Sequence, residues 1–362
     1  FEEVRNGLLI SLFQHKITIM KHRTFFWFIL PTFAAMVLFI ALPIVSVLIQ
    51  SLFVEHEQVL VVSESCGPFG CQKTTSIDAE ATAALREAKP LGKFNGLGTY
   101  FDRSHLATAE VAEIWRSSSE TESFISGLMD LKFYKAMIFT LTYTFTVTPL
   151  VLILGLAVAV GVNNLPFALR GVAIFISLLP FLVATIVGSM ILSWMVDGEG
   201  IIGATLQKVF NDPSLSIKAS TPLMWTMLIV YGVWHTLPFS FITFYAGLQT
   251  VPQDTMEAAK VDGASKWQSM IHVVVPHLMP LVSFVTLMLL MDNFRVFEPI
   301  ISFQAEAHAQ SLSTFIQSDL REAGNPLYAS ASATSMLTII GVVILLIPVL
   351  LRTWRDFSRK AH

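Results

Sequence analysis

The sequence has little charge and almost no cysteine, and each shortage excludes a class of protein. Charged residues make up 14% of the 362 residues, against 54% hydrophobic residues. This balance is too apolar for a soluble domain and is typical of a membrane protein. The formal charge of -3 is too small to indicate a nucleic-acid partner. The two cysteines, Cys66 and Cys71, lack the second ligand pair of a structural zinc site, so we expect no bound metal.

Motifs for catalysis are missing as well. The chain contains no GxxxxGK[ST] nucleotide-binding stretch, no HExxH and no GxSxG, and its nine histidines are scattered. We therefore expect no enzyme active site and no cofactor in this chain, and ATP would have to be hydrolysed by another chain.

Six long apolar runs are present, and they predict an all-α membrane protein with six transmembrane helices. A helix rises about 1.5 Å per residue, so about 20 apolar residues cross a bilayer. The first run lacks a signal-peptide cleavage site and is too long for a signal-peptide core, so we expect it to be retained. The runs cover residues 25–53, about 133–162, 172–196, 222–248, 277–303 and 328–351.

Polar segments divide the chain around these runs. Residues 1–24 form a basic flank, and residues 54–132 form an insert after the first span. The five-helix core covers residues 133–351 and contains a polar loop at 252–276, and a basic tail covers residues 352–362. The insert is longer than a connector needs. It is either a small folded element that contacts an external partner or a tolerated insertion.

Lysine and arginine gather on one side of the expected spans. Because these residues are retained on the cytoplasmic side, we expect both termini and the 252–276 loop in the cytoplasm and the insert in the periplasm. There Cys66 and Cys71 either close a small disulfide or remain two thiols. The cytoplasmic set is Arg5, Lys16, Lys21, Arg23, Arg170, Lys260, Lys266, Arg352, Arg355, Arg359 and Lys360, whereas the opposite short flanks carry Lys208, Lys218 and Arg321.

The loop between the fourth and fifth runs is amphipathic and too polar to enter lipid. Asp254 with Glu257, and Ser265 with Gln268, have the spacing of helix-capping pairs. Gly263 lies between the pairs, and glycine accepts the left-handed backbone that ends many helices. The loop therefore predicts a helix, a sharp turn and a second helix.

The loop also carries a spaced motif. Glu257, Ala258 and Ala259 are followed after three residues by Gly263, and after nine more by a V-x-V-P stretch that ends at Pro276. This order resembles the EAA loop of bacterial ABC importer permeases, with valine at both aliphatic positions. The adjoining LQTVP and DGA stretches look like the carbohydrate branch of that family, close to the maltose-type permeases. An ordinary amphipathic connector explains the polarity of the loop but not this spacing.

The resemblance spans about residues 133–359, and it implies the transmembrane subunit of an ATP-driven importer in the bacterial inner membrane. The EAA loop would dock on an ATP-binding subunit, with Glu257 as the anionic contact and Gly263 as the turn between its helices. The implied partners are a second permease, two ATP-binding subunits that hold ATP and magnesium, and a periplasmic solute-binding protein.

Two of the spans contain polar residues, which are costly in lipid unless they face protein or a water-filled cavity. In the fourth span, His235, Thr236 and Phe239 fall within one helical arc of about 100°. They would offer hydrogen bonds and an aromatic ring to a sugar. The alternative is a histidine bonded to a neighbouring helix.

In the fifth span, Arg295 has Asp292 and Glu298 three residues away on either side. It is either held by these carboxylates or available to a solute. A stand-alone secondary transporter, in which His235, Asp292 or Glu298 carries protons, is the competing function. Co-purification with an ATP-binding subunit would separate the two functions.

Asn293 matches, by its distance from Pro276, an asparagine that the resemblance places in the sugar pocket. Leu289 and Val296 are apolar where the maltose-type pocket is polar, so we expect a different solute with fewer hydroxyls on that side. An anionic sugar stays open, because His235 or Arg295 can offset its charge.

Overall fold

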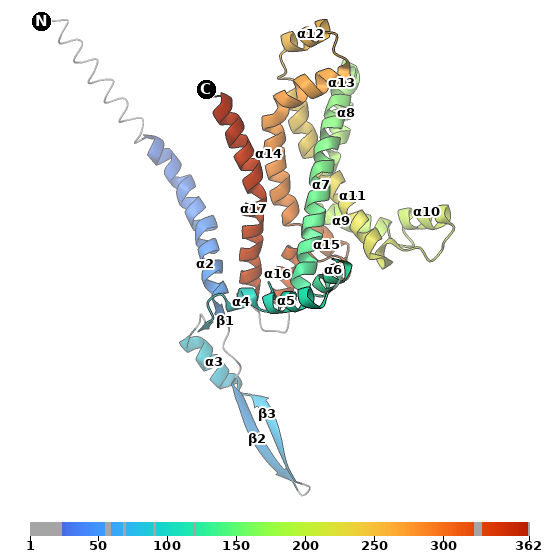
Figure 1. Cartoon of the computed structure of the whole chain (residues 1–362). Coiled ribbons are helices and arrows are strands. Elements are labelled where there is room, and N and C mark those ends of the chain that lie inside the picture. Colours follow the sequence, from blue (N-terminus) through green and yellow to red (C-terminus); the bar gives the residue numbers. More distant parts are fainter. Residues whose placement is uncertain are drawn as a thin grey trace, which may run out of the picture. The chain divides into compact units, whose positions relative to one another are not determined.

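The computed structural model describes residues 24–54, 59–67, 70–89, 92–118, 121–321 and 328–360. It divides into two compact units, Phe1–Gly96 and Leu97–His362, which are described separately below (Figure 1).

The first unit opens with a long apolar helix, Thr24–Ser51. A π turn, η1 (Val37–Ala41), interrupts it before α2 (Leu42–Ser51). The wide turn comes directly before Pro43, which has no amide hydrogen to donate. The helix confirms the expected first span.

The described part of the insert in this unit contains short strands and one helix. β2 (Leu60–Gly67) pairs antiparallel with β3 (Gly70–Ile77), and β1 (Phe53–Val54) pairs with β4 (Lys93–Phe94). α3 (Ala79–Ala88) begins at Asp78, whose carboxylate accepts bonds from two backbone amides. The strand register sets Cys66 opposite Cys71. Their side chains lie outside the described part of the chain, so the choice between a disulfide and two thiols stays open.

The second unit is helical throughout its described elements. The described part of this unit contains four long apolar segments. They are α7 (Lys132–Asn163), α11 (Thr221–Leu248), the run Lys266–Phe294 and α17 (Tyr328–Lys360). With the first unit's helix, five described helices are long and apolar enough to cross a membrane. The shorter helices are α4 (Gly98–Phe101), α5 (Thr108–Ser117), α6 (Thr121–Met129), α10 (Ile201–Phe210), η2 (Ile217–Ala219), α15 (Glu298–Ser302) and α16 (Leu312–Arg321).

The sixth expected span is bent. α8 (Phe167–Leu182) and α9 (Thr185–Met195) meet at 92° across Val183 and Ala184, which have extended backbones. Pro180 removes one amide donor just before the break. The hydroxyl of Tyr231 donates to the carbonyl of Thr185 at 2.7 Å, which holds the start of α9. The third apolar run is thus two helices rather than one.

The expected bounds of the fifth span were wrong at its end. The helix runs without interruption from Lys266 through α13 (Lys266–Ser269), η3 (Met270–Val274) and α14 (Val275–Phe294). It stops at Phe294 instead of continuing to residue 303. α15 follows as a separate short helix, and Pro299 lies in its first turn. The run changes direction around η3 (Figure 1). The second helix of the polar loop is therefore joined directly to the fifth span.

The core of this unit lies where α7 packs against α11 and α14. Glycines allow the helices to approach closely, because a Cβ at Gly232 would overlap the Tyr143 hydroxyl and one at Gly155 would overlap Ser240. The rings of Tyr143, Tyr231 and other buried apolar side chains fill the space between the helices. This packing fixes the polar residues that line the cavities described next.

Candidate functional site

The polar loop forms two helices joined by a tight turn. α12 (Gln253–Val261) is followed by Asp262 and by Gly263, whose φ is +75°. No atom of the described residues would contact a Cβ at Gly263. The amide of Gly263 donates to the carbonyl of Lys260 and the amide of Ala264 to that of Ala259, both at 3.0 Å. These two bonds are the Schellman pattern of a helix C-terminus. The expected helix, turn and helix are confirmed.

The two expected capping pairs differ in outcome. Ser265 and Gln268 form a capping box: the amide of Ser265 donates to the Gln268 side chain at 2.8 Å, and the amide of Gln268 donates to the Ser265 hydroxyl at 3.2 Å. The expected cap at Asp254 is wrong, because α12 begins after Pro252 without a side-chain cap. Asp254 instead lies in the first turn, where a carboxylate interacts favourably with the helix dipole.

The loop presents both acidic and apolar groups at its surface. Glu257 and Ala258 are exposed, and Ala259 is half-buried. Val261 is 87% exposed and Trp267 is 72% exposed. Large apolar side chains at this exposure on a charged loop are typical of a protein interface.

Two adjoining cavities lie in the helical unit, and together they bring the predicted pocket residues to one place. The first, of about 380 Å³, is lined by Tyr143, Thr185, Tyr231, Gly232, His235, Thr236, Asp292, Asn293, Arg295, Val296, Phe297, Glu298 and Pro299. The second, of about 560 Å³, is lined by Phe181, His235, Thr236, Phe239, Met288, Leu289, Met291, Asp292, Arg295, Thr338, Ile339, Val342 and Val343. Every one of the six predicted pocket residues lines at least one of them.

His235 stands where the two cavities meet. Its Nε2 lies 3.0 Å from the hydroxyl of Thr185, and its ring stacks on Tyr231 at 5.8 Å with an interplanar angle of 8°. Its Nδ1 is buried and has no hydrogen-bond partner among the described residues. The histidine is thus bonded to a neighbouring helix, as the alternative supposed, and it also lines both cavities.

Asn293 and Thr236 are already bonded to protein groups. The amide of Asn293, which is 3% exposed, donates to the Thr148 hydroxyl at 3.1 Å and joins α14 to α7. The Thr236 hydroxyl donates to the carbonyl of Gly232 at 2.7 Å. The Thr236 hydroxyl can still accept a hydrogen bond, and the Asn293 side-chain amide retains one N–H donor and its acceptor oxygen.

Charges in the first cavity are paired in part. A guanidinium nitrogen of Arg295 lies 3.2 Å from a carboxylate oxygen of Asp292, and both side chains are more than half exposed. Glu298 lines the same cavity. The apolar Leu289 and Val296 are both nearly fully buried, so they contribute walls rather than hydrogen bonds.

Sequence reasoning missed the aromatic and hydroxyl groups that other helices contribute. Tyr143, Tyr231 and Thr185 line the first cavity from α7, α11 and α9. Nothing in the sequence distinguishes these tyrosines from ordinary core residues. Thr185 directly follows the break after Pro180, and that proline was the available signal.

Comparisons with known proteins agree with one another. Residues 123–358 match the sequence model of the family described as "Binding-protein-dependent transport system inner membrane component". A probable ABC transporter permease of Brucella abortus is 26% identical over 72% of this chain and 81% of its own length. The trehalose/maltose transport system permease of Thermococcus litoralis is 28% identical over 54% of this chain and 60% of its own length.

A solved structure shares the fold. A chain from a bacterial ABC transporter involved in the import of the acidic polysaccharide alginate superimposes with a TM-score of 0.55, at 18% identity. The superposition covers 75% of this chain and 95% of the other.

Proposed function

The chain belongs to the family of binding-protein-dependent transport system inner membrane components, and on that premise we propose that it is a membrane subunit of an ATP-driven importer for a carbohydrate or carbohydrate derivative. The observation that carries the proposal is the EAA loop, Glu257 to Gly263, which leads at Lys266 into the helical run that reaches the cavity-lining Asp292 and Asn293. Alternating access is the mechanism that we infer.

A carbohydrate is supported by the chemistry of the cavities. Sugar sites combine a few placed polar groups with apolar and aromatic walls. Here His235, Thr236 and Asn293 supply polar groups, and Phe239 lines the apolar cavity together with Leu289. The named relative from Thermococcus litoralis transports trehalose and maltose, which favours the same class of solute.

The charges favour a neutral sugar over an anionic one. Arg295 is the cation that an anionic sugar would need, and it is paired with Asp292. Glu298 adds a second carboxylate to the same cavity. An acid group on the solute would meet this net negative set at close range, and like charges repel.

Docking on an ATP-binding subunit is the role that we assign to the loop. Glu257, Ala258 and Ala259 form one turn of α12, and the exposed Val261 and Trp267 flank the turn at Gly263. An apolar centre with a charged rim is the usual anatomy of a protein interface. The partners would be two ATP-binding subunits that hold ATP and magnesium, a second permease and a periplasmic solute-binding protein.

Movement of the loop would reach the cavities through one helix. From Lys266 to Phe294 the run is 29 residues long, or about 43 Å at 1.5 Å per residue. Asp292 and Asn293 lie in its last turn. The π turn η3, with its wider hydrogen-bond spacing, is the place where the run changes direction. A displacement of α13 is therefore passed to the cavity walls without an intervening loop.

The orientation follows the lysines and arginines. With the loop in the cytoplasm, both termini lie inside and the insert lies in the periplasm of a multi-pass inner membrane protein. This is also the side on which ATP-binding subunits are found.

The experiment is uptake of labelled maltose, trehalose and an anionic sugar by the transporter reconstituted in liposomes with its co-purified subunits. We expect uptake of a neutral sugar that needs ATP and is insensitive to a protonophore. Uptake that persists without ATP and stops when the proton gradient is collapsed would instead favour the proton-coupled secondary transporter.

A further inference from the structure

α10 (Ile201–Phe210) is a short helix with an unusual exposure of apolar side chains. Ile201 is 75% exposed, Val209 is 71% exposed and Phe210 is 67% exposed. At 100° per residue, these three side chains share one half of the helix with Ile202 and Leu206, which are half-buried. Ten residues rise about 15 Å, too little to cross a bilayer.

The helix is held firmly rather than loosely attached. A Cβ at Gly200 would overlap the carbonyl oxygen of Trp194, and one at Gly203 would overlap that of Asp197, so the start of α10 rests directly on the end of α9. The side-chain amide of Gln207 donates to the carbonyl of Leu215 at 3.1 Å, which ties the helix to the following loop.

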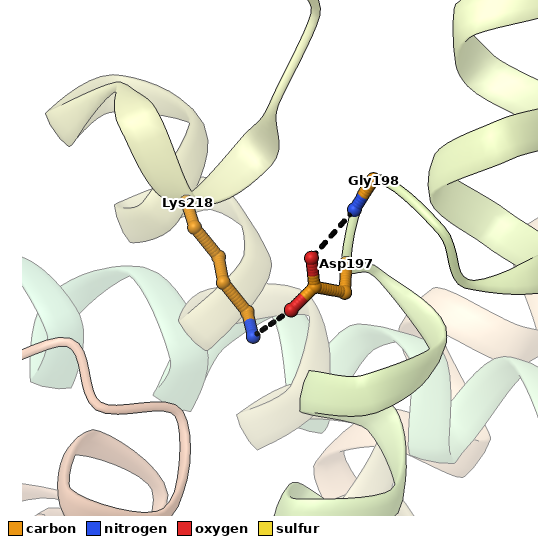
Figure 2. A network of polar contacts seen from close by, with 3 residues as sticks. All are labelled: Asp197, Gly198 and Lys218. Carbon is orange, nitrogen blue, oxygen red and sulfur yellow. Dashed lines mark hydrogen bonds and ion pairs between the residues drawn. The ribbon is translucent and has the colours of Figure 1, made fainter.

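Asp197 bonds to both Gly198 and Lys218 (Figure 2). One carboxylate oxygen accepts from the amide of Gly198 at 2.8 Å, and the other lies 2.9 Å from Nζ of Lys218. The ion pair links the end of α9 to η2 (Ile217–Ala219), on the far side of α10 in sequence. The exposed apolar side chains are thus displayed on a fixed scaffold.

α9 leads into α10 with an apolar stripe of its own. Five exposed side chains fall within one arc of about 140°, while Ser189 and Ser193 on the opposite face are buried. The stripe ends at Trp194, a residue type enriched where a bilayer meets water. Its members are Ile186, Val187, Met190, Ile191 and Trp194.

Charged groups lie at the edge of the apolar half of α10 and in the loop that follows it. Asp212 is exposed, and its carboxylate accepts from the amide and hydroxyl of Ser214 at 2.9 and 2.6 Å. The Ser214 hydroxyl and amide lower the pKa of Asp212, and the bond from Lys218 lowers the pKa of Asp197. Both carboxylates therefore remain ionised and need water nearby. Lys208 is also exposed, and at 100° per residue it lies at the edge of the apolar half, about 20° from Ile201.

We propose that α10 lies in the plane of the bilayer surface, with Ile201, Val209 and Phe210 inserted among lipid chains and with Lys208 and Asp212 in water. Lipid is the occupant because the helix begins on the last turn of α9, whose exposed stripe already belongs to a membrane segment. An apolar helix face is stable at such a boundary, and a lysine at its edge can extend its stem so that its ammonium group reaches water. α10 projects to one side of the bundle, in the half of the unit opposite α12 and α13 (Figure 1).

The test places one nitroxide label at a time in the assembled transporter in liposomes, after replacement of Cys66 and Cys71 by serine. Labels at Ile201→Cys and Val209→Cys are compared with a control at Ser214→Cys, an exposed polar position of the next loop. Collisions with oxygen, which concentrates in lipid, and with a water-soluble nickel chelate are measured for each label.

The proposal predicts that oxygen collisions exceed nickel collisions at positions 201 and 209 and that this ratio reverses at position 214. Two results would overturn it. Shielding of both labels from both reagents would mean that another protein surface covers α10, and a nickel-dominated ratio at both positions would mean that the helix lies in water. The two label sites are independent, so the loss of one variant leaves the other to decide.

Discussion

The two ends of the helix Lys266–Phe294 have opposite surroundings. At the loop end, Trp267 is 72% exposed and the helix is fixed by a capping box with its own neighbours. At the cavity end, Asn293 and Phe294 are each 3% exposed, and Asn293 is bonded to another helix. The loop end is accessible to another protein, and the cavity end is packed into the core of this unit. On the proposed function, the exposed end would bind an ATP-binding subunit and the buried end would change the shape of the cavities.

The largest expected effect comes from breaking the turn at the loop end. Gly263→Val puts a branched side chain at a φ of +75°, which costs about 1–2 kcal/mol for a non-glycine residue and more for a β-branched one. We expect normal amounts of protein in the membrane, ATP hydrolysis that no longer responds to solute, and loss of uptake. The measurements are uptake and ATPase rates in liposomes.

Gly161→Val is the matched control for this variant. Like Gly263, Gly161 has open space around the position of a Cβ, but it lies within α7 and has no positive φ. It should therefore transport close to the wild-type rate. Equal loss in both variants would show that added bulk, and not the turn, is responsible.

The next effect comes from the cavity end. Asn293→Ala removes a buried hydrogen bond between α14 and α7 together with any bond to solute, and a lost buried bond costs about 1–3 kcal/mol. We expect uptake to weaken several-fold without loss of assembly. Thr148→Val removes the same interhelical bond and leaves Asn293 in place. If its effect on uptake is smaller than that of Asn293→Ala, the difference between the two effects measures the solute contact of Asn293. Equal effects would assign Asn293 to packing alone.

A smaller effect is expected from the second helix of the loop. Ser265→Ala removes the capping box, which is worth about 1 kcal/mol, and should lower coupled uptake modestly. Asp254→Ala should change it less, because Asp254 makes no cap bond. A larger loss in Asp254→Ala than in Ser265→Ala would mean that the carboxylate contacts the ATP-binding subunit.

The smallest effect concerns the ion pair outside the spans. The bond from Lys218 lowers the pKa of Asp197 below its ordinary value of about 3.9, so the pair contributes stability above that value and loses it as the pH falls through the lowered pKa. Lys218→Met should leave uptake at pH 7 near wild type, since the Asp197 side chain is 59% exposed and neither residue lines the two cavities. Thermal unfolding of the two proteins should differ at pH 7 and converge in acid. A difference that grows in acid would contradict the pairing.

Local signals predicted the loop well, and they predicted the cavity in part. Ser265, Gln268 and Gly263 act through neighbours in sequence, and their roles were readable from spacing. His235 was found because polar residues in apolar runs are few, and Asn293 was assigned by its distance from Pro276, through the resemblance to the maltose-type permeases. Tyr143 and Thr185 were missed because their position depends on how α7 and α9 pack.

The bounds of the spans show the same limit. Hydropathy predicted six runs, yet it joined α8 to α9 and extended the fifth helix past Phe294. Apolar composition identifies a segment that lies in the membrane, but it does not show where the backbone changes direction within that segment. The bend at Val183 and Ala184 depends on Pro180 and on the bond from Tyr231 to Thr185, which comes from a distant part of the chain.

The most direct test measures whether the accessibility of the cavity end changes when ATP is added to the assembled transporter. A single cysteine at Met291, which lines the larger cavity and is 46% exposed, is labelled with a water-soluble thiol reagent in the assembled transporter, with and without ATP, after replacement of Cys66 and Cys71 by serine. The labelling rate should change with ATP in this protein and should not change when Gly263→Val is added. An ATP-dependent change of the same size in both proteins would contradict transmission through the loop.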